Sequence, residues 1–134
     1  MDTIVLDTDV FSFFLREGDS RAETYRPLVK DKRIALSFVR VGELYVWPAK
    51  RKWSPRRTAA LEAALASAIV IPYDLELCRV FGRVKASLPR GVNVPSLDLW
   101  IAVCAMRHSS PLLTHNTRDF ERIPGLVLLR AQIP

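Results

Sequence analysis

The chain has 134 residues, of which 49% are hydrophobic and 25% are charged, and this composition excludes a disordered or low-complexity protein. The length fits one domain, residues 1–134, with a substantial core. Twenty Lys and Arg residues against fourteen Asp and Glu residues give a formal net charge of +6, which is compatible with a polyanionic partner such as a nucleic acid.

The sequence carries no sign of export or of membrane insertion. Asp2 stands where a secretory signal would carry positive charge, and the apolar run 99–106 is too short to span a bilayer. Cys78 and Cys104 have apolar neighbours and form no CxxC pair, so we expect reduced core thiols in place of a disulfide or a zinc site. We therefore expect a cytoplasmic protein without a membrane partner.

Short apolar runs alternate with longer stretches of helical period along the whole chain. Strands are predicted at residues 3–7, 34–37, 69–71, 112–114 and 126–129. Helices are predicted at residues 10–16, 22–31, 39–52, 55–66, 75–88 and 97–107. This alternation favours an α/β domain with a mostly parallel sheet, because parallel neighbours need helical crossovers. Such sheets bind their ligands beyond the carboxyl ends of the strands.

Two carboxylates follow predicted strands directly. Asp7 closes the first strand, and Asp119 lies in the short polar segment after the strand at 112–114. Both are therefore expected at the edge of the sheet where sites form.

Two further carboxylates lie on predicted helices. Glu43 is about two turns into a helix that Ser37 is expected to cap, and most of its neighbours three and four residues away are apolar, so we expect it to face inward. Asp98 shares a face with apolar residues in a helix that Ser96 is expected to cap. A carboxylate in the first turn also favours the helix dipole by about 0.3–1 kcal/mol, so a purely structural role for Asp98 is an alternative.

Together these acids predict a metal site, since like charges brought together destabilise the fold unless a cation lies among them. Oxygen ligands without a Cys or His cluster point to Mg²⁺ or Mn²⁺, while His108 and His115 are expected to have surface or local hydrogen-bonding roles. Such an ion supports phosphodiester hydrolysis. We hypothesise that Asp7 and Asp98 are the primary metal ligands. Glu43 and Asp119 would ligate the ion or orient its bound water.

A basic run lies between the second and third predicted strands. It is a candidate phosphate-binding surface, and the alternative is an ordinary solvated helix end and loop. Its members are Lys50, Arg51, Lys52, Arg56 and Arg57.

Four segments together resemble the PIN-domain ribonucleases and, within them, the VapC toxins of bacterial toxin-antitoxin pairs. They are IVLDTDVFSFFL, IALSFVRVGELYVW, LDLWIAVCAM and PLLTHNTRDFERIPGLVLL, and they cover essentially the whole chain. The resemblance implies a three-layer α/β/α sandwich with a five-stranded sheet, a homodimer, and cleavage of RNA with Mg²⁺ or Mn²⁺. It also implies a small VapB-type antitoxin, whose extended tail covers the active-site groove and whose other end binds DNA.

The catalytic acids of this family carry over onto Asp7, Glu43 and Asp98. The fourth position is less regular, because many relatives have an acid where Asn116 stands. The pattern TxNxxxF in this chain favours Asp119 as the fourth acid, with Asn116 and Thr114 supporting the site.

The chain also departs from the family pattern. Arg40 stands where relatives often have Thr, and it can pair with Glu43 and weaken metal binding there. Asp9 stands where Asn is common, and it can add a fifth acid or cap the first helix. Neither change removes a core ligand, so we expect activity to be retained. Trp47 and Trp53 are candidates for a protein interface or for helix packing.

Two other functions fit parts of the sequence. LDTDVF also matches the strand end of haloacid-dehalogenase-type phosphatases, in which Asp7 would be the nucleophile and Asp9 the acid and base, although the chain is short for that fold. The second alternative is a PIN-like domain that binds RNA without cleaving it. The sequence does not identify which RNA is the substrate.

Overall fold

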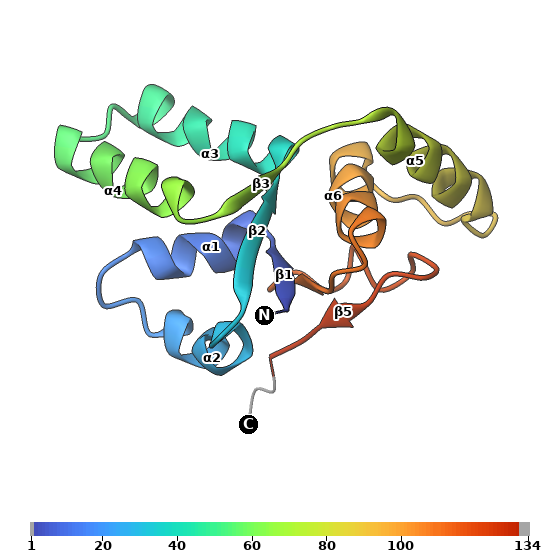
Figure 1. Cartoon of the computed structure of the whole chain (residues 1–134), viewed down its shortest axis with the longest axis horizontal. Helices are drawn as coiled ribbons and strands as arrows, with labels where there is room; N and C mark the ends of the chain where they lie inside the picture. Colours follow the sequence, from blue (N-terminus) through green and yellow to red (C-terminus); the bar gives the residue numbers. More distant parts are fainter. Residues whose placement is uncertain (1, 132–134) are drawn as a thin grey trace.

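The computed structural model describes residues 2–131 and contains five strands and six helices in that range (Figure 1). The strands are β1 (Thr3–Leu6), β2 (Arg33–Ser37), β3 (Ile69–Ile71), β4 (Leu112–Leu113) and β5 (Leu128–Leu129). The helices are α1 (Thr8–Leu15), α2 (Arg21–Val29), α3 (Phe38–Arg51), α4 (Pro55–Ala66), α5 (Leu75–Ser87) and α6 (Ser96–Arg107). Each predicted element is present, with boundaries within two residues of the prediction. Among these residues, no helix has the length and apolar character needed to cross a membrane.

The five strands form one sheet in the order β3-β2-β1-β4-β5, and every neighbouring pair is parallel. β1 is central: Ile4 is in register with Ile34 of β2, and Val5 with Leu112 of β4. The predicted α/β class and five-stranded parallel sheet are confirmed. Because all strands run the same way, the segments after β1, β2 and β4 leave the sheet at one common edge.

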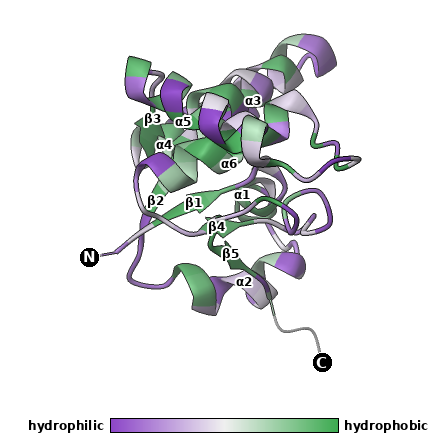
Figure 2. Cartoon of the chain, turned by 90° about the vertical axis from the view of Figure 1, so that its right-hand side faces the viewer, coloured by the Kyte–Doolittle hydropathy of each residue, from purple (hydrophilic) through white to green (hydrophobic). Residues whose placement is uncertain are grey.

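Helices cover both faces of the sheet, since successive strand residues point to opposite sides. Val5, Ala35 and Leu112 face a core that includes α5 and α6, whereas Leu6, Leu36 and Leu113 do not. These latter residues pack in a second core with α1, α2, α3 and α4. Figure 1 shows α5 and α6 on one side of the sheet and α1 to α4 on the other. Figure 2 shows the strands in the green of hydrophobic residues, with hydrophilic segments on helices and loops. The predicted three-layer sandwich is confirmed.

Acceptor side chains hold the first turns of four helices, α1, α3, α4 and α5. Asp7 accepts from the backbone N–H of Thr8 and caps α1. The predicted cap of α3 is confirmed, because Ser37 accepts from the N–H of Arg40. The predicted cap of α6 is wrong. Pro95 occupies the cap position, with φ −52° and ψ 137°, and Ser96 is already the first helical residue. Its hydroxyl therefore comes one position too late to accept from the first turn.

The two cysteines differ in exposure. Cys104 on α6 is fully buried, as predicted, and burial raises the pKa of its thiol to about 11. Cys78 is exposed, so its predicted place in the core is wrong. The buried residues of α5 are Leu77, Val80 and Val84, and Cys78 lies off that stripe on the solvent side of the helix.

Candidate functional site

Three of the predicted acids meet at the carboxyl edge of the central strands. Asp7 follows β1 directly, Glu43 lies on α3 and Asp98 lies in the first turn of α6. The side chain of Arg40, from the first turn of α3, lies among them and forms an ion pair with each. Its Nε is 2.7 Å from Asp7 Oδ1, its Nη1 is 2.6 Å from Glu43 Oε1, and its Nη2 is 2.8 Å from Asp98 Oδ1. We call these four residues the Arg40 cluster.

Arg40 is a buried cation, and only 9% of its side chain is exposed. Burial opposes its charge, but the carboxylates of Asp7, Glu43 and Asp98 outweigh that effect and raise the pKa of the guanidinium. Its contacts to Glu43 and Asp98 are also well-directed hydrogen bonds, whereas the Nε contact to Asp7 is an ion pair without that alignment. The predicted pairing of Arg40 with Glu43 is confirmed, and the structure adds two partners that the sequence did not indicate.

Asp7 is the most constrained of the acids, with only 5% of the residue exposed. Its Oδ1 accepts from the Thr8 N–H at 2.8 Å and faces Arg40, while its Oδ2 accepts from the Thr114 hydroxyl at 2.8 Å. Thr114 follows β4 directly, so the neighbouring strand and the first helix both fix this carboxylate. Such contacts orient a ligand side chain before any ion binds.

Glu43 and Asp98 lie closer to solvent than Asp7. The Glu43 side chain is 39% exposed, because the adjacent Leu44 takes the core position on α3; the predicted inward orientation of Glu43 therefore holds only in part. The Asp98 side chain is 15% exposed. Burial raises the pKa of Asp98, with Arg40 acting in the opposite direction and the charges of Asp7 and Asp119 adding to the rise.

The fourth predicted acid, Asp119, lies in the loop after β4 and is linked to Asp7 through other side chains. Asp119 Oδ2 accepts from the Asn116 side-chain amide at 2.8 Å, and the Asn116 N–H donates to the Thr114 hydroxyl at 3.1 Å. The loop thus links Asp119 to the threonine that holds Asp7. Asp119 is therefore connected to Asp7 through two intervening side chains, Asn116 and Thr114.

Asp9 ties the first helix to the same loop, a contact that its position in the sequence did not reveal. Its carboxylate accepts from the N–H of Val10 at 2.6 Å and from the N–H of His115 at 3.1 Å. Burial raises the pKa of Asp9, and the nearby charge of Asp7 raises it further. The expected local role of His115 is found in its ring, which bonds through Nδ1 to the Tyr25 hydroxyl. Asp9 is therefore a fifth acid at this edge, and Asp7 is the residue that caps α1.

The acids at this edge have the donor chemistry that Mg²⁺ and Mn²⁺ prefer, since all of them offer carboxylate oxygens. Within residues 2–131, however, no three acidic, His or Cys side chains are arranged to hold an ion. The reason is visible in the Arg40 cluster, where the guanidinium occupies the space among Asp7, Glu43 and Asp98.

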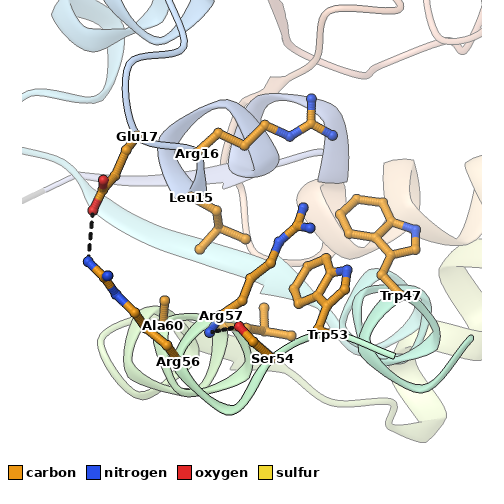
Figure 3. Close-up of a pocket in the computed structure, with 10 residues that line it drawn as sticks. Leu15, Arg16, Glu17, Trp47, Trp53, Ser54, Arg56, Arg57 and Ala60 are labelled. Carbon is orange, nitrogen blue, oxygen red and sulfur yellow. Dashed lines mark hydrogen bonds and ion pairs between the residues drawn. The ribbon is translucent and has the colours of Figure 1, made fainter. Parts of the chain in front are cut away.

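A groove of about 450 Å³ lies away from these acids, among the ends of α1 and α3 and the start of α4 (Figure 3). Two indoles form one wall, with the ring centroids of Trp47 and Trp53 6.3 Å apart. The Arg57 guanidinium lies 4.0 Å from the centre of the Trp53 ring, and Leu15 points into the groove. Both tryptophans also pack on the adjoining core, so the helix-packing role is confirmed for them, and the protein interface stays a prediction. We call this feature the tryptophan groove.

The predicted basic run surrounds one end of the tryptophan groove. All five cations of the run are exposed, at the end of α3 and the start of α4. Arg56 and Arg57 line the groove, and Arg56 faces Glu17 at 3.9 Å across its rim. Because Arg56 and Glu17 are both more than 90% exposed, this ion pair adds little stability.

The whole fold has a counterpart among known families. Residues 4–126 match the family model described as the PIN domain. The chain belongs to the PIN-domain family. The phosphatase alternative has no support from this match.

This PIN domain has curated relatives of nearly the same length. It is 27% identical over 126 residues to "Ribonuclease VapC2" of Rickettsia felis, covering 92% of this chain and 94% of the relative. It is 29% identical over 123 residues to "tRNA(fMet)-specific endonuclease VapC" of Shigella flexneri, covering 91% and 92%.

Solved structures share the fold of this PIN domain. A chain in the crystal structure of VapBC2 from Rickettsia felis bound to a DNA fragment from their promoter superposes with a TM-score of 0.80 at 26% identity, covering 95% of this chain and 97% of that chain. A chain in the structure of DNA-bound VapBC from Salmonella typhimurium gives 0.78 at 27% identity, covering 96% and 98%.

Proposed function

We propose that this PIN domain is a VapC-type endoribonuclease that depends on Mg²⁺ or Mn²⁺. The observation that carries the proposal is the meeting of Asp7, Glu43 and Asp98 at the carboxyl edge of the central strands. The relatives named as ribonucleases match more than nine-tenths of this chain, which supports the same assignment.

Each residue at this edge has a role in the proposed reaction. Asp7 and Asp98 would hold the ion, which when bound polarises a phosphoryl oxygen and acidifies water. Glu43 and Asp119 would orient the attacking water and accept its proton. Thr114 and the Thr8 N–H keep Asp7 in one orientation. The basic run would hold the RNA through its phosphates, which supplies affinity without selecting a sequence.

We further propose a VapB-type antitoxin as the protein partner. The support is that solved structures similar to this chain include VapBC assemblies from two organisms. Co-expression with a small protein encoded beside this chain should yield a stable complex in which RNA cleavage is suppressed. Recovery of the chain alone from its native host, under conditions that preserve complexes, would contradict the pairing.

A homodimer, acting in the cytoplasm where RNA is abundant, completes the proposal. Phe38 and Tyr73 contact each other with a ring-centroid distance of 6.1 Å, yet they are 37% and 72% exposed. Leu75 nearby in the chain is 66% exposed. Exposed apolar side chains of this kind are common in surfaces that associate. Light scattering of the purified chain, compared with a Tyr73→Ser/Leu75→Ser variant, tests this assembly.

The activity is tested with purified chain and a mixed RNA substrate in Mg²⁺ or Mn²⁺. Asp7→Asn should lower the cleavage rate by about 100-fold or more, which corresponds to about 2.7 kcal/mol of transition-state stabilisation. Asp2→Asn is the matched control, because it makes the same change at a carboxylate that is 87% exposed, and its rate should equal that of the wild type.

The result also separates the alternatives. A folded Asp7→Asn protein that cleaves RNA at the wild-type rate would refute the assignment. Hydrolysis of a small phosphomonoester with intact RNA would favour the phosphatase reading. Binding of RNA without any cleavage would favour the inert PIN-like domain.

A further inference from the structure

The Arg40 cluster places a protein cation where the proposed reaction needs a metal cation. We propose that Arg40 is an internal competitor of the divalent ion, so that metal binding requires its side chain to leave Asp7, Glu43 and Asp98. This inference rests on the proposed function, because it takes the same carboxylates to be metal ligands. It adds a regulatory residue to that site.

The first step of the argument is the identity of the acceptor atoms. Each of three guanidinium nitrogens contacts a different carboxylate, at 2.6–2.8 Å. These are the lengths of charge-assisted contacts, and the planar fork of arginine lets one side chain engage several acceptors at once. The arrangement therefore uses one oxygen from each of Asp7, Glu43 and Asp98, and those oxygens are not accessible to an ion at the same time.

The second step is charge. Three carboxylates against one guanidinium leave the cluster with a net negative charge. Asp9 adds to it, since its carboxylate shares the Thr114 hydroxyl with Asp7, and Asp119 is linked to the same threonine through Asn116. A divalent ion is therefore still attracted to this edge. An ion seated among the three acids would, however, lie within a few ångströms of the buried Arg40 charge and be repelled by it. The two cations exclude each other from one position.

The third step is a route out for the guanidinium. Glu43 is 39% exposed and receives Nη1, so this side of the cluster opens to solvent. A long flexible side chain can swing in that direction without a change in the backbone of α3. The ion then binds only the fraction of molecules in which Arg40 has moved, and the apparent dissociation constant rises in inverse proportion to that fraction.

The test compares Mn²⁺ binding by titration calorimetry and by thermal unfolding in the full chain and in three variants. Arg40→Thr removes the competitor, and Arg40→Lys keeps the charge on a group that cannot engage three acids in the same fork. Arg79→Thr is the matched control, because Arg79 also pairs with a Glu three residues away, Glu76, at 3.3 Å and on an exposed helix face.

We expect the Mn²⁺ dissociation constant of Arg40→Thr to be about tenfold lower than that of the wild type, as it would be if Arg40 leaves the cluster in about one molecule in ten. Arg40→Lys should fall between the two, and Arg79→Thr should match the wild type. In EDTA, Arg40→Thr should melt below the wild type, and Mn²⁺ should raise its Tm by more, since binding to the folded form stabilises it. Adding Asp7→Asn to Arg40→Thr should remove the gain in affinity.

Equal Mn²⁺ affinity in the wild type and Arg40→Thr would overturn the inference, and would leave Arg40 as a structural counter-ion only. If Arg40→Thr does not fold, Arg40→Lys decides, and an unchanged dissociation constant in that variant overturns the inference as well. RNA cleavage by the wild type is a separate readout. Normal cleavage with equal affinities rejects the competition alone, whereas tighter Mn²⁺ binding by Arg40→Thr without any cleavage rejects the nuclease alone.

Discussion

Arginine has different structural roles in the Arg40 cluster and in the tryptophan groove. The Arg40 side chain is 9% exposed and contacts three carboxylates within 2.8 Å, whereas Arg57 is exposed and its guanidinium carbon lies 4.0 Å from the centre of the Trp53 ring. Removal of Arg40 leaves carboxylates without a cation to pair with. Removal of Arg57 leaves an indole that water can cover. One residue type thus holds a charged centre together in one region and only covers an apolar surface in the other.

The two regions also differ in how firmly their side chains are held. Both oxygens of Asp7 accept hydrogen bonds from groups on different elements, so this carboxylate keeps one orientation wherever the Arg40 side chain lies. The groove is lined by long side chains such as Arg16, Arg56 and Arg57, which can adopt many rotamers. Chemistry that needs fixed geometry fits the first region, and recognition of a flexible macromolecule fits the second.

The largest expected effect is on stability at the Arg40 cluster. Arg40→Met in metal-free buffer should lower the free energy of unfolding by about 3 kcal/mol, because it leaves several carboxylates without the buried cation that pairs with them. Urea unfolding followed by circular dichroism measures this loss. In an Asp98→Asn background the same substitution should lower the free energy of unfolding by less, since one of the carboxylates that it leaves unpaired is already absent. Equal costs in the two backgrounds would show that Arg40 and Asp98 are not coupled.

An intermediate effect is expected on RNA binding at the basic run. Changing Lys50, Arg51 and Lys52 to Gln should flatten the dependence of log affinity on log salt by about 0.7 for each cation that contacts a phosphate of single-stranded RNA. The matched control changes Arg79, Arg83 and Lys85 on α5, and should leave that slope unaltered. Filter binding of a catalytically inactive variant at several salt concentrations gives both slopes. A larger change of slope in the control variant would indicate that RNA binds along α5 and not along the basic run.

The smallest effect is expected at Arg57. Arg57→Met should lower the free energy of unfolding by about 0.5 kcal/mol, the usual worth of an exposed cation–π contact. It is the same substitution as at Arg40, so the same urea experiment compares the two arginines directly. A loss at Arg57 as large as that at Arg40 would mean that the groove is part of the structural core, and the contrast between the regions would fail.

The sequence was sufficient to predict the fold and the meeting of the acids. Its apolar runs and helical periods located each element, and the rule that parallel strands share a carboxyl edge placed Asp7, Glu43 and Asp98 together. Local errors had local causes. Ser96 has the residue type of a helix cap, but Pro95 with its fixed φ occupies the cap position. Cys78 has apolar neighbours in the sequence, but its phase relative to Leu77 and Val80 puts it on the outer face of α5.

The central position of Arg40 could not be predicted in the same way. Its spacing from Glu43 indicated one ion pair, since residues three apart are neighbours on a helix. Its contact with Asp98 spans 58 positions in the chain, and the reach to Asp7 depends on a side-chain rotamer that packing selects. Like charges brought together need a cation, and Arg40 of the chain itself meets part of that need, while the metal ion stays a prediction.

The hydrogen bond between Thr114 and Asp7 joins positions 107 residues apart. In the sheet, β1 lies between β2, which is synthesised soon after it, and β4, which is synthesised much later. During synthesis β1 can pair with β2 soon after both emerge from the ribosome, but its other flank waits for β4. The acidic edge is therefore completed only after residue 114 has been translated, and the site that it forms is incomplete until then. Contacts of such long range also slow folding, which lengthens this interval.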